Sequence, residues 1–167
     1  MAGRQQPRIQ KSLMFYGFGF PIELRDVPFR KVLGEWIPAI DYDALSRAFL
    51  AVLPRKPVRL SGDEVRFIRL TMGLTLEEFG RRFDVSHPAV KKWESSGDKP
   101  TNMRWAAEKD VRLAALDYVH VNAREFVKAY ERFVTAPPRA THHQPSVQLG
   151  AILDASRRDQ VSDEAWA

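Results

Sequence analysis

The residues best suited to chemistry in this chain are cations that follow a serine at helical spacing. The stretch DVSHPAVKKWE, residues 84–94, places Ser86 before a histidine and a proline, and Lys91 and Lys92 follow one turn later. The serine hydroxyl can cap a helix, and proline is tolerated in a first helical turn because no N–H bond is lost there. Lysine and histidine side chains donate hydrogen bonds to anionic oxygens. The stretch therefore predicts a short helix that packs inward through Trp93 and presents its other face to a polyanion.

No arrangement typical of an enzyme accompanies this stretch. The chain has no cysteine, which excludes disulfides, thiolate metal sites and cysteine nucleophiles. His142 and His143 are adjacent in a polar stretch without further metal ligands, and Gly17 and Gly19 precede a proline instead of opening a helix as phosphate-binding loops do. We therefore predict no catalytic residue, no metal site and no cofactor.

The charge of the chain favours an acidic partner. Its 167 residues carry a formal net charge of +5, and the excess of Lys and Arg lies in the first hundred residues. Such a bias is typical of proteins that bind nucleic acid, although it is weak evidence by itself. A hydrophobic content of 44% supports a core. The sequence has no run of about 18 apolar residues, which a membrane span would need. A cytoplasmic protein without a membrane partner is the expectation.

The N-terminal third is expected to be a small β-plus-helix module at residues 13–57, preceded by a disordered basic segment at 1–12. Glycine and proline interrupt every helical period between Leu13 and Ile40, and the alternation in IELR and FRKV indicates short antiparallel strands. Asp41 then opens a helix that ends at a proline.

After a basic, proline-marked joint at residues 54–60, start signals for helices recur. SGDE at 61–64 and TLEE at 75–78 have the form of capping boxes, in which the hydroxyl accepts an early backbone N–H and the glutamate reaches back to the cap. Helices are expected to begin at these two caps and near Ser86, Met103 and Asn122.

The helices expected at 76–83 and 87–94 are joined so tightly that they must cross each other. The small Gly80 allows the second helix to approach closely, and Asp84 can adopt the left-handed backbone that the turn requires. The apolar side chains of the helix at 87–94 would then face the protein core, and its hydrogen-bond donors would face outward, as in a helix that enters a major groove.

These residues resemble the Cro/repressor (XRE-type) helix-turn-helix family over positions 60–94. VSHPAVKKWE at 85–94 matches the family element VSxxxVxxWE, and the layout with a small β segment in front is similar to antitoxin-type regulators of this family. The zinc-binding cysteines of those regulators are absent, so only the DNA-binding half carries over. The resemblance implies a mainly α fold with a lambda-repressor-like helix-turn-helix domain at 58–120. The cap at Asn122 and the polar, proline-marked stretch that begins at Pro137 predict a C-terminal helix at 121–136 and a flexible tail at 137–167.

The sequence departs from the family pattern at three positions. Gly80 stands where alanine is usual and Asp84 where glycine is usual, and both changes are physically conservative. Pro88 stands where glutamine is common in the family. That glutamine often contacts adenine, and proline cannot make this contact. Base preference must then depend on His87, on Lys92 and on methyl contacts from Pro88 or Ala89.

The residues expected to contact DNA are polar, basic or small and fall on or beside this helix pair. They are Thr75, Arg81, Arg82, Ser86, His87, Pro88, Ala89, Lys91, Lys92 and Lys99. Backbone N–H groups near Thr75 are candidates for a direct phosphate contact. Trp93 is expected in the core, and Glu94 is expected to pair within the protein.

The sequence thus predicts a regulator of transcription that binds specific sites in double-stranded DNA as a homodimer, acting on its own or a neighbouring operon. One alternative is an antitoxin that binds a toxin protein and regulates itself through DNA. Another is a structural protein that binds DNA without sequence preference. YGFGF at 16–20 resembles part of an RNA-recognition strand, but core packing or dimer packing is the favoured interpretation.

Overall fold

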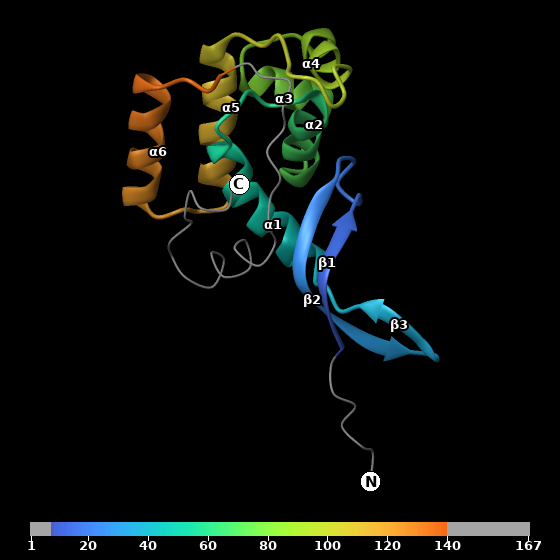
Figure 1. Ribbon diagram of the computed structural model, residues 1–167. Helices are drawn as coiled ribbons and strands as arrows, with labels where there is room; N and C mark the ends of the chain where they lie inside the picture. The colour runs from blue at the N-terminus through green and yellow to red at the C-terminus, as the bar shows by residue number, and fades with distance from the viewer. Residues whose placement is uncertain (1–7, 140–167) are drawn as a thin grey trace.

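The computed structural model describes residues 8–139 and begins with an antiparallel sheet of three strands in the order β1-β2-β3. The strands are β1 (Arg8–Phe15), β2 (Ile22–Val32) and β3 (Glu35–Pro38). β1 pairs with the first part of β2, whereas β3 pairs with its last part, from Phe29 to Val32. The β2–β3 hairpin therefore projects away from the helices (Figure 1).

Six α-helices follow the sheet along the described chain (Figure 1). They are α1 (Tyr42–Val52), α2 (Gly62–Thr71), α3 (Leu76–Arg82), α4 (His87–Glu94), α5 (Trp105–Tyr118) and α6 (Ala123–Thr135), and a 3₁₀ turn, η1 (Leu53–Arg55), extends α1. The predicted capping boxes at Ser61 and Thr75 both form, and the helix starts expected from the sequence are confirmed within about two residues. No helix between residues 8 and 139 combines the length and the apolar character needed to cross a membrane.

The prediction of a mainly α fold is wrong, because the sheet is a full part of the architecture. β2 has 11 residues, and its Ile22, Leu24 and Val27 are buried in the main core. The fold is therefore α+β, with strands that precede the helices. The sequence suggested two short strands here, but Asp26 takes a φ of 52° and lets one strand bend and continue through Pro28, which lies opposite Ile9.

The predicted boundaries of the chain ends also need correction. β1 begins at Arg8, so the expected disorder of residues 1–12 is wrong for the last five of them, which belong to a strand that pairs with β2. At the other end Arg139 forms a parallel bridge with Val58. Residues 1–7 and 140–167, with the short helix expected near 147–156 and the histidine pair at 142–143, lie outside the described residues.

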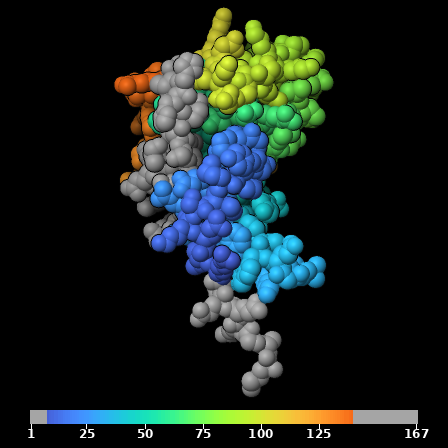
Figure 2. Space-filling model, turned by 45° about the vertical axis from the view of Figure 1, so that its right-hand side comes forward, coloured from blue at the N-terminus to red at the C-terminus, as the bar shows by residue number. Residues whose placement is uncertain are grey.

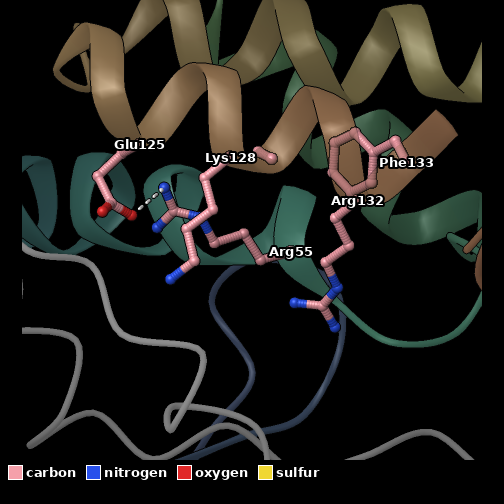
Figure 3. A pocket seen from close by; sticks show the side chains of 6 residues that line it. Arg55, Glu125, Lys128, Arg132 and Phe133 are labelled. Carbon is pink, nitrogen blue, oxygen red and sulfur yellow. Dashed lines mark hydrogen bonds and ion pairs between the residues drawn. The ribbon is translucent and has the colours of Figure 1, made fainter. Parts of the chain in front are cut away.

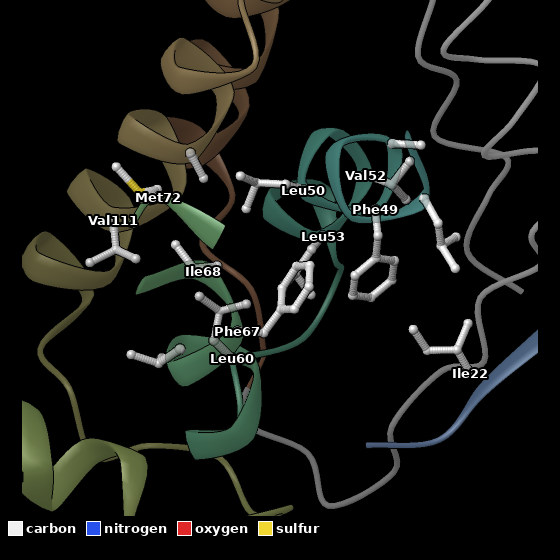
Figure 4. Close-up of a cluster of buried hydrophobic side chains, with 14 of the residues drawn as sticks. Ile22, Phe49, Leu50, Val52, Leu53, Leu60, Phe67, Ile68, Met72 and Val111 are labelled. Atoms are coloured by element: carbon white, nitrogen blue, oxygen red, sulfur yellow. The ribbon is translucent and has the colours of Figure 1, made fainter. Parts of the chain in front are cut away.

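One hydrophobic core joins the predicted N-terminal module to the helices (Figure 4). Phe18, in the turn between β1 and β2, lies with its ring 4.6 Å from that of Phe67 in α2 and 5.7 Å from that of Phe49 in α1. The side chains of Ile22 and Val111 reach the same cluster from β2 and α5. The module therefore cannot be treated as a separate unit, because it shares its apolar side chains with the helical part.

In the basic joint expected at residues 54–60, Pro54, Arg55, Lys56 and Leu60 are buried, and ion pairs hold the segment. Lys56 is 1% exposed, and its Nζ donates to both carboxylate oxygens of Glu64 at 2.6 and 2.7 Å. Burial lowers the pKa of Lys56, while the Glu64 carboxylate acts in the opposite direction. Arg112 of α5 is fully buried and donates to the carbonyl oxygens of Pro54, Lys56 and Val58. These contacts fasten the segment to α2 and α5.

Candidate nucleic-acid interface

The turn between α3 and α4 depends on two residues with unusual backbone or steric demands. A Cβ at Gly80 would lie 2.6 Å from the carbonyl oxygen of Val85, and the Val85 N–H donates to the Gly80 carbonyl at 2.9 Å. Asp84 has a φ of 54°, the left-handed conformation predicted for it. The close approach of the two helices therefore leaves little room for a side chain at position 80.

α4 is anchored to the core through its inner face. Val90 is completely buried and Trp93 is 8% exposed, as predicted for the tryptophan. Glu94 accepts hydrogen bonds from Nε and Nη2 of Arg69 at 2.6 and 3.0 Å, which confirms that it pairs within the protein. Arg69 also donates to the Leu74 carbonyl, so one side chain connects α2, the start of α3 and the end of α4. The helix is thus fixed in position before any ligand binds.

The outer face of α4 carries the predicted site residues that the structure brings together. Ser86, His87, Pro88, Lys91 and Lys92 are exposed, and Ala89 is half-buried. The Ser86 hydroxyl accepts the Ala89 N–H at 3.4 Å, so this serine caps the helix. Figure 2 shows the residues of α3 and α4 in yellow-green at one end of the described molecule, opposite the light-blue β2–β3 hairpin. Nothing within the described chain covers the cations on this end.

The arginines of α3 extend the basic surface. Arg81 pairs with Glu77 at 3.3 Å, but both side chains are about three-quarters exposed. An ion pair this exposed contributes little and can be exchanged for a phosphate contact at small cost. Arg82 is exposed and, like Lys91 and Lys92, forms no ion pair with a carboxylate of residues 8–139.

Thr75 serves as a helix cap, and the structure does not support its predicted role in phosphate binding. Its backbone N–H donates to Glu78 Oε2 at 2.8 Å, and its hydroxyl accepts the Glu78 N–H at 3.1 Å. The backbone hydrogen bond from Thr75 lowers the pKa of Glu78, so this carboxylate stays charged at neutral pH. With Glu77 beside it, the start of α3 is negatively charged and repels a phosphate.

Lys99 is not on the same structural element as the α4 cations. It lies in the loop after α4, where its carbonyl accepts the Gly62 N–H and the Gly97 carbonyl accepts the Asp63 N–H. Burial and the neighbouring Asp98 raise the pKa of Asp63. Lys99 itself is exposed, and the structure places it in this loop and not on α4.

The aromatic stretch at residues 16–20 does not form an RNA-stacking strand. Phe18 and Phe20 pack against Phe49 and Phe67 inside the protein, and the stretch is a turn instead of a strand. Tyr16 is the one ring of the three left exposed, at 65%. Core packing, one of the two favoured interpretations, is therefore confirmed for both phenylalanines.

A second group of cations was missed in the sequence. Lys128 and Arg132 lie four residues apart on α6; Arg55 lines one pocket with both of them (Figure 3), and Arg139 lines a second pocket with Arg132. The spacing of 128 and 132 indicates one helical face. Their meeting with Arg55 and Arg139 depends on tertiary packing and carries no sequence signal.

Comparisons of the chain with known protein families, with curated proteins and with solved structures find no match. The geometry of the described residues is therefore the ground for any functional conclusion.

Proposed function

We propose that the protein binds specific sites in double-stranded DNA through α4 and regulates transcription, in the manner of the XRE-type regulators that residues 60–94 resemble. The observation that carries this proposal is the two-sided character of α4. Val90 and Trp93 are buried against the core, while Ser86, His87, Lys91 and Lys92 are exposed at one end of the molecule. Major-groove recognition requires a helix that is fixed through its buried face and presents hydrogen-bond donors on its exposed face.

The exposed side chains suit both parts of such recognition. Lys91 and Lys92 can donate to phosphates or to the O6 and N7 atoms of guanine, and His87 can donate from the start of the helix. Pro88 and Ala89 offer apolar surface for a thymine methyl group. Phosphate contacts supply affinity and base contacts supply sequence preference.

A homodimer is part of the proposal. One recognition helix covers only a few base pairs, and two half-sites related by a two-fold axis raise the specificity. A regulator of this kind acts in the cytoplasm, where the chromosome is.

The test is selection of bound fragments from the source genome by the purified full chain at physiological salt. The Lys91→Ala/Lys92→Ala variant is compared with Arg30→Ala/Lys31→Ala, which removes two adjacent exposed cations from the projecting hairpin. We expect the wild-type protein and the hairpin variant to enrich the same inverted repeat and the α4 variant to lose it. Equal loss in both variants, or no enriched sequence with the wild type, would exclude specific recognition by α4.

A second candidate function is that of an antitoxin, which binds a toxin protein and regulates its own operon. It is favoured by the tip of the β2–β3 hairpin, where Leu33 is 101% exposed and Trp36 is 38% exposed. Large apolar side chains at an exposed tip are typical of protein contacts. Co-purification of the product of a neighbouring gene with the wild type, and its loss with Leu33→Asp, would support this function. Purification of the wild type without any such product would argue against it.

A further inference from the structure

A groove of about 750 Å³ lies where the turn between β1 and β2 meets three helices. Its lining comes from that turn, from the first half of α1, from the second half of α2 and from Tyr118, the last residue of α5. Figure 1 shows the turn beside the end of α2, between the sheet and the helices. The volume falls within the usual range of small-ligand sites, so the groove has room for a small molecule.

Part of the groove wall is apolar. Leu70 is 55% exposed and Tyr118 is 41% exposed, and both line the groove together with the rings of Phe18 and Phe67. Single exposed apolar side chains are common on proteins, but several that line one hollow offer an apolar surface to a ligand. Because three of these four side chains are aromatic, an aromatic ring is the apolar group that suits this wall best.

The groove also contains one carboxylate and one guanidinium group. Asp43 and Arg47 lie one turn apart on α1, are exposed and line the groove together. The same spacing joins Glu77 to Arg81 in an ion pair at 3.3 Å. Asp43 and Arg47, in contrast, form no ion pair with each other or with any other of residues 8–139. Two opposite charges are thus available to one ligand.

The walls of this groove are held in place by aromatic contacts. The ring of Phe18, in the turn, lies 4.6 Å from that of Phe67, which joins the turn to α2. The ring of Phe15 stacks on that of Tyr42 at 5.8 Å, which joins the end of β1 to the start of α1. Because these elements are already fixed relative to one another, a ligand would bind without a large loss of conformational entropy.

We propose that this groove binds an α-amino acid with an aromatic side chain. Arg47 can hold the carboxylate of the ligand with paired hydrogen bonds, and Asp43 can accept hydrogen bonds from its ammonium group. The ring of the ligand would lie against Phe18, Leu70 and Tyr118. In an α-amino acid both charged groups are bonded to one carbon, so two side chains one helical turn apart can contact both.

The two charges and the apolar wall together favour this class of ligand. A ligand with a single charge would leave either the carboxylate or the guanidinium group of the groove without a partner, and a ligand without a ring would leave the aromatic wall uncovered. The proposal does not rest on DNA binding by α4, since no residue of α3 or α4 lines the groove.

The test is titration of the full chain with L-phenylalanine, followed by the NMR spectrum of the protein, which detects millimolar dissociation constants. Three relatives serve as separate probes: 3-phenylpropanoate lacks the ammonium group, 2-phenylethylamine lacks the carboxylate and L-alanine lacks the ring. We expect L-phenylalanine to bind with a Kd below about 1 mM and each relative to bind at least about tenfold more weakly.

Two variants match the groups of the groove to those of the ligand. Asp43→Asn should weaken binding of L-phenylalanine by about tenfold and leave that of 3-phenylpropanoate unchanged, because this probe has no ammonium group. Arg47→Gln should weaken binding of L-phenylalanine by about tenfold and leave that of 2-phenylethylamine unchanged. Asp110→Asn and Arg30→Gln remove the same charges from exposed positions outside the groove and should bind like the wild type. All four variants should melt close to the wild type, because these side chains are exposed.

Three results would overturn the proposal. A Kd of the wild type for L-phenylalanine above about 1 mM would refute the site. Equal affinity for L-phenylalanine and for a relative that lacks one charge would show that this charge is not recognised, and would remove the amino acid assignment. Equal weakening in the two control variants would show a general effect of charge. Because the selection of DNA fragments depends on α4 and not on this groove, either proposal can fail without the other.

Discussion

Two basic regions of this chain differ in how far the fold exposes their cations to solvent. The segment at 54–60 and the helix pair α3–α4 both hold pairs of adjacent cations, Arg55-Lys56 in the first and Lys91-Lys92 in the second. Arg55 and Lys56 are buried, at 5% and 1% exposed, whereas Lys91 and Lys92 are exposed. The density of positive charge is therefore a poor guide to which cations are available to a ligand.

Carboxylates from distant elements explain the difference. Glu64 of α2 pairs with Lys56, and Glu108 of α5, itself fully buried, accepts hydrogen bonds from Arg59, Arg112 and the Leu60 N–H. A buried cation is tolerated when such partners satisfy it. α4 has one carboxylate, Glu94, which pairs with Arg69, and Lys91 and Lys92 are exposed and form no ion pair with a carboxylate of residues 8–139.

The largest expected effect comes from breaking the buried network. Glu108→Gln should lower the free energy of unfolding by about 3–5 kcal/mol, because it leaves the buried guanidinium group of Arg112 and the partly exposed one of Arg59 without their counter-charge. Urea unfolding followed by circular dichroism measures this. Asp110→Asn, an exposed change two residues away, should alter stability by less than about 0.5 kcal/mol. Similar small effects from both variants would contradict the importance assigned to the network.

A smaller effect is expected at the turn that positions α4. Gly80→Ala gains about 1 kcal/mol of helix propensity but forces its Cβ against the Val85 carbonyl, and such overpacking costs about 1–3 kcal/mol. We expect a net loss of about 1 kcal/mol in the same unfolding measurement, together with weaker DNA binding. Arg82→Ala, on the exposed face of α3, should leave the unfolding free energy unchanged. A stabilised Gly80→Ala variant would show that the turn has more room than the structure indicates.

The exposed cations should affect binding and leave stability almost unchanged. Lys91→Ala/Lys92→Ala should change the unfolding free energy by less than about 0.5 kcal/mol, because neither side chain has a partner in the described protein. If both lysines contact phosphates, the slope of log K against log salt concentration should fall by about 1.8. Fluorescence anisotropy of labelled duplex DNA at several salt concentrations measures the slope. An unchanged slope together with lost sequence preference would assign both lysines to bases.

The smallest effect is expected at the start of α3, as a dependence on pH. The folded state lowers the pKa of Glu78, so the stabilisation from this charged carboxylate is present above the ordinary glutamate pKa and is lost as the pH falls through the lowered value. The wild type should therefore melt at a higher temperature than Glu78→Gln at pH 7, and the difference should vanish in acid. A difference that is constant with pH would show that the charge of Glu78 does not contribute.

Features that depend on a few neighbouring residues could be predicted from the sequence. The caps at Ser61, Thr75 and Ser86 and the left-handed Asp84 are decided by contacts within three or four positions along the chain. The inward position of Trp93 follows from helical periodicity in the same way.

The burial of the charged residues and the place of the sheet in the core were decided by tertiary structure. Arg55 meets Glu125 across 70 positions, Arg59 meets Glu108 across 49, and the apolar side of the sheet meets α1 and α2 only after folding. For this reason the sequence suggested a basic, proline-marked joint and a small β segment, where the structure has a buried network and a shared core. Local pattern determined where helices begin and which of their faces are apolar. The distribution of charge between interior and surface depended on which distant carboxylates the packing brought within hydrogen-bond distance, because a charge can leave water only when such a partner replaces it.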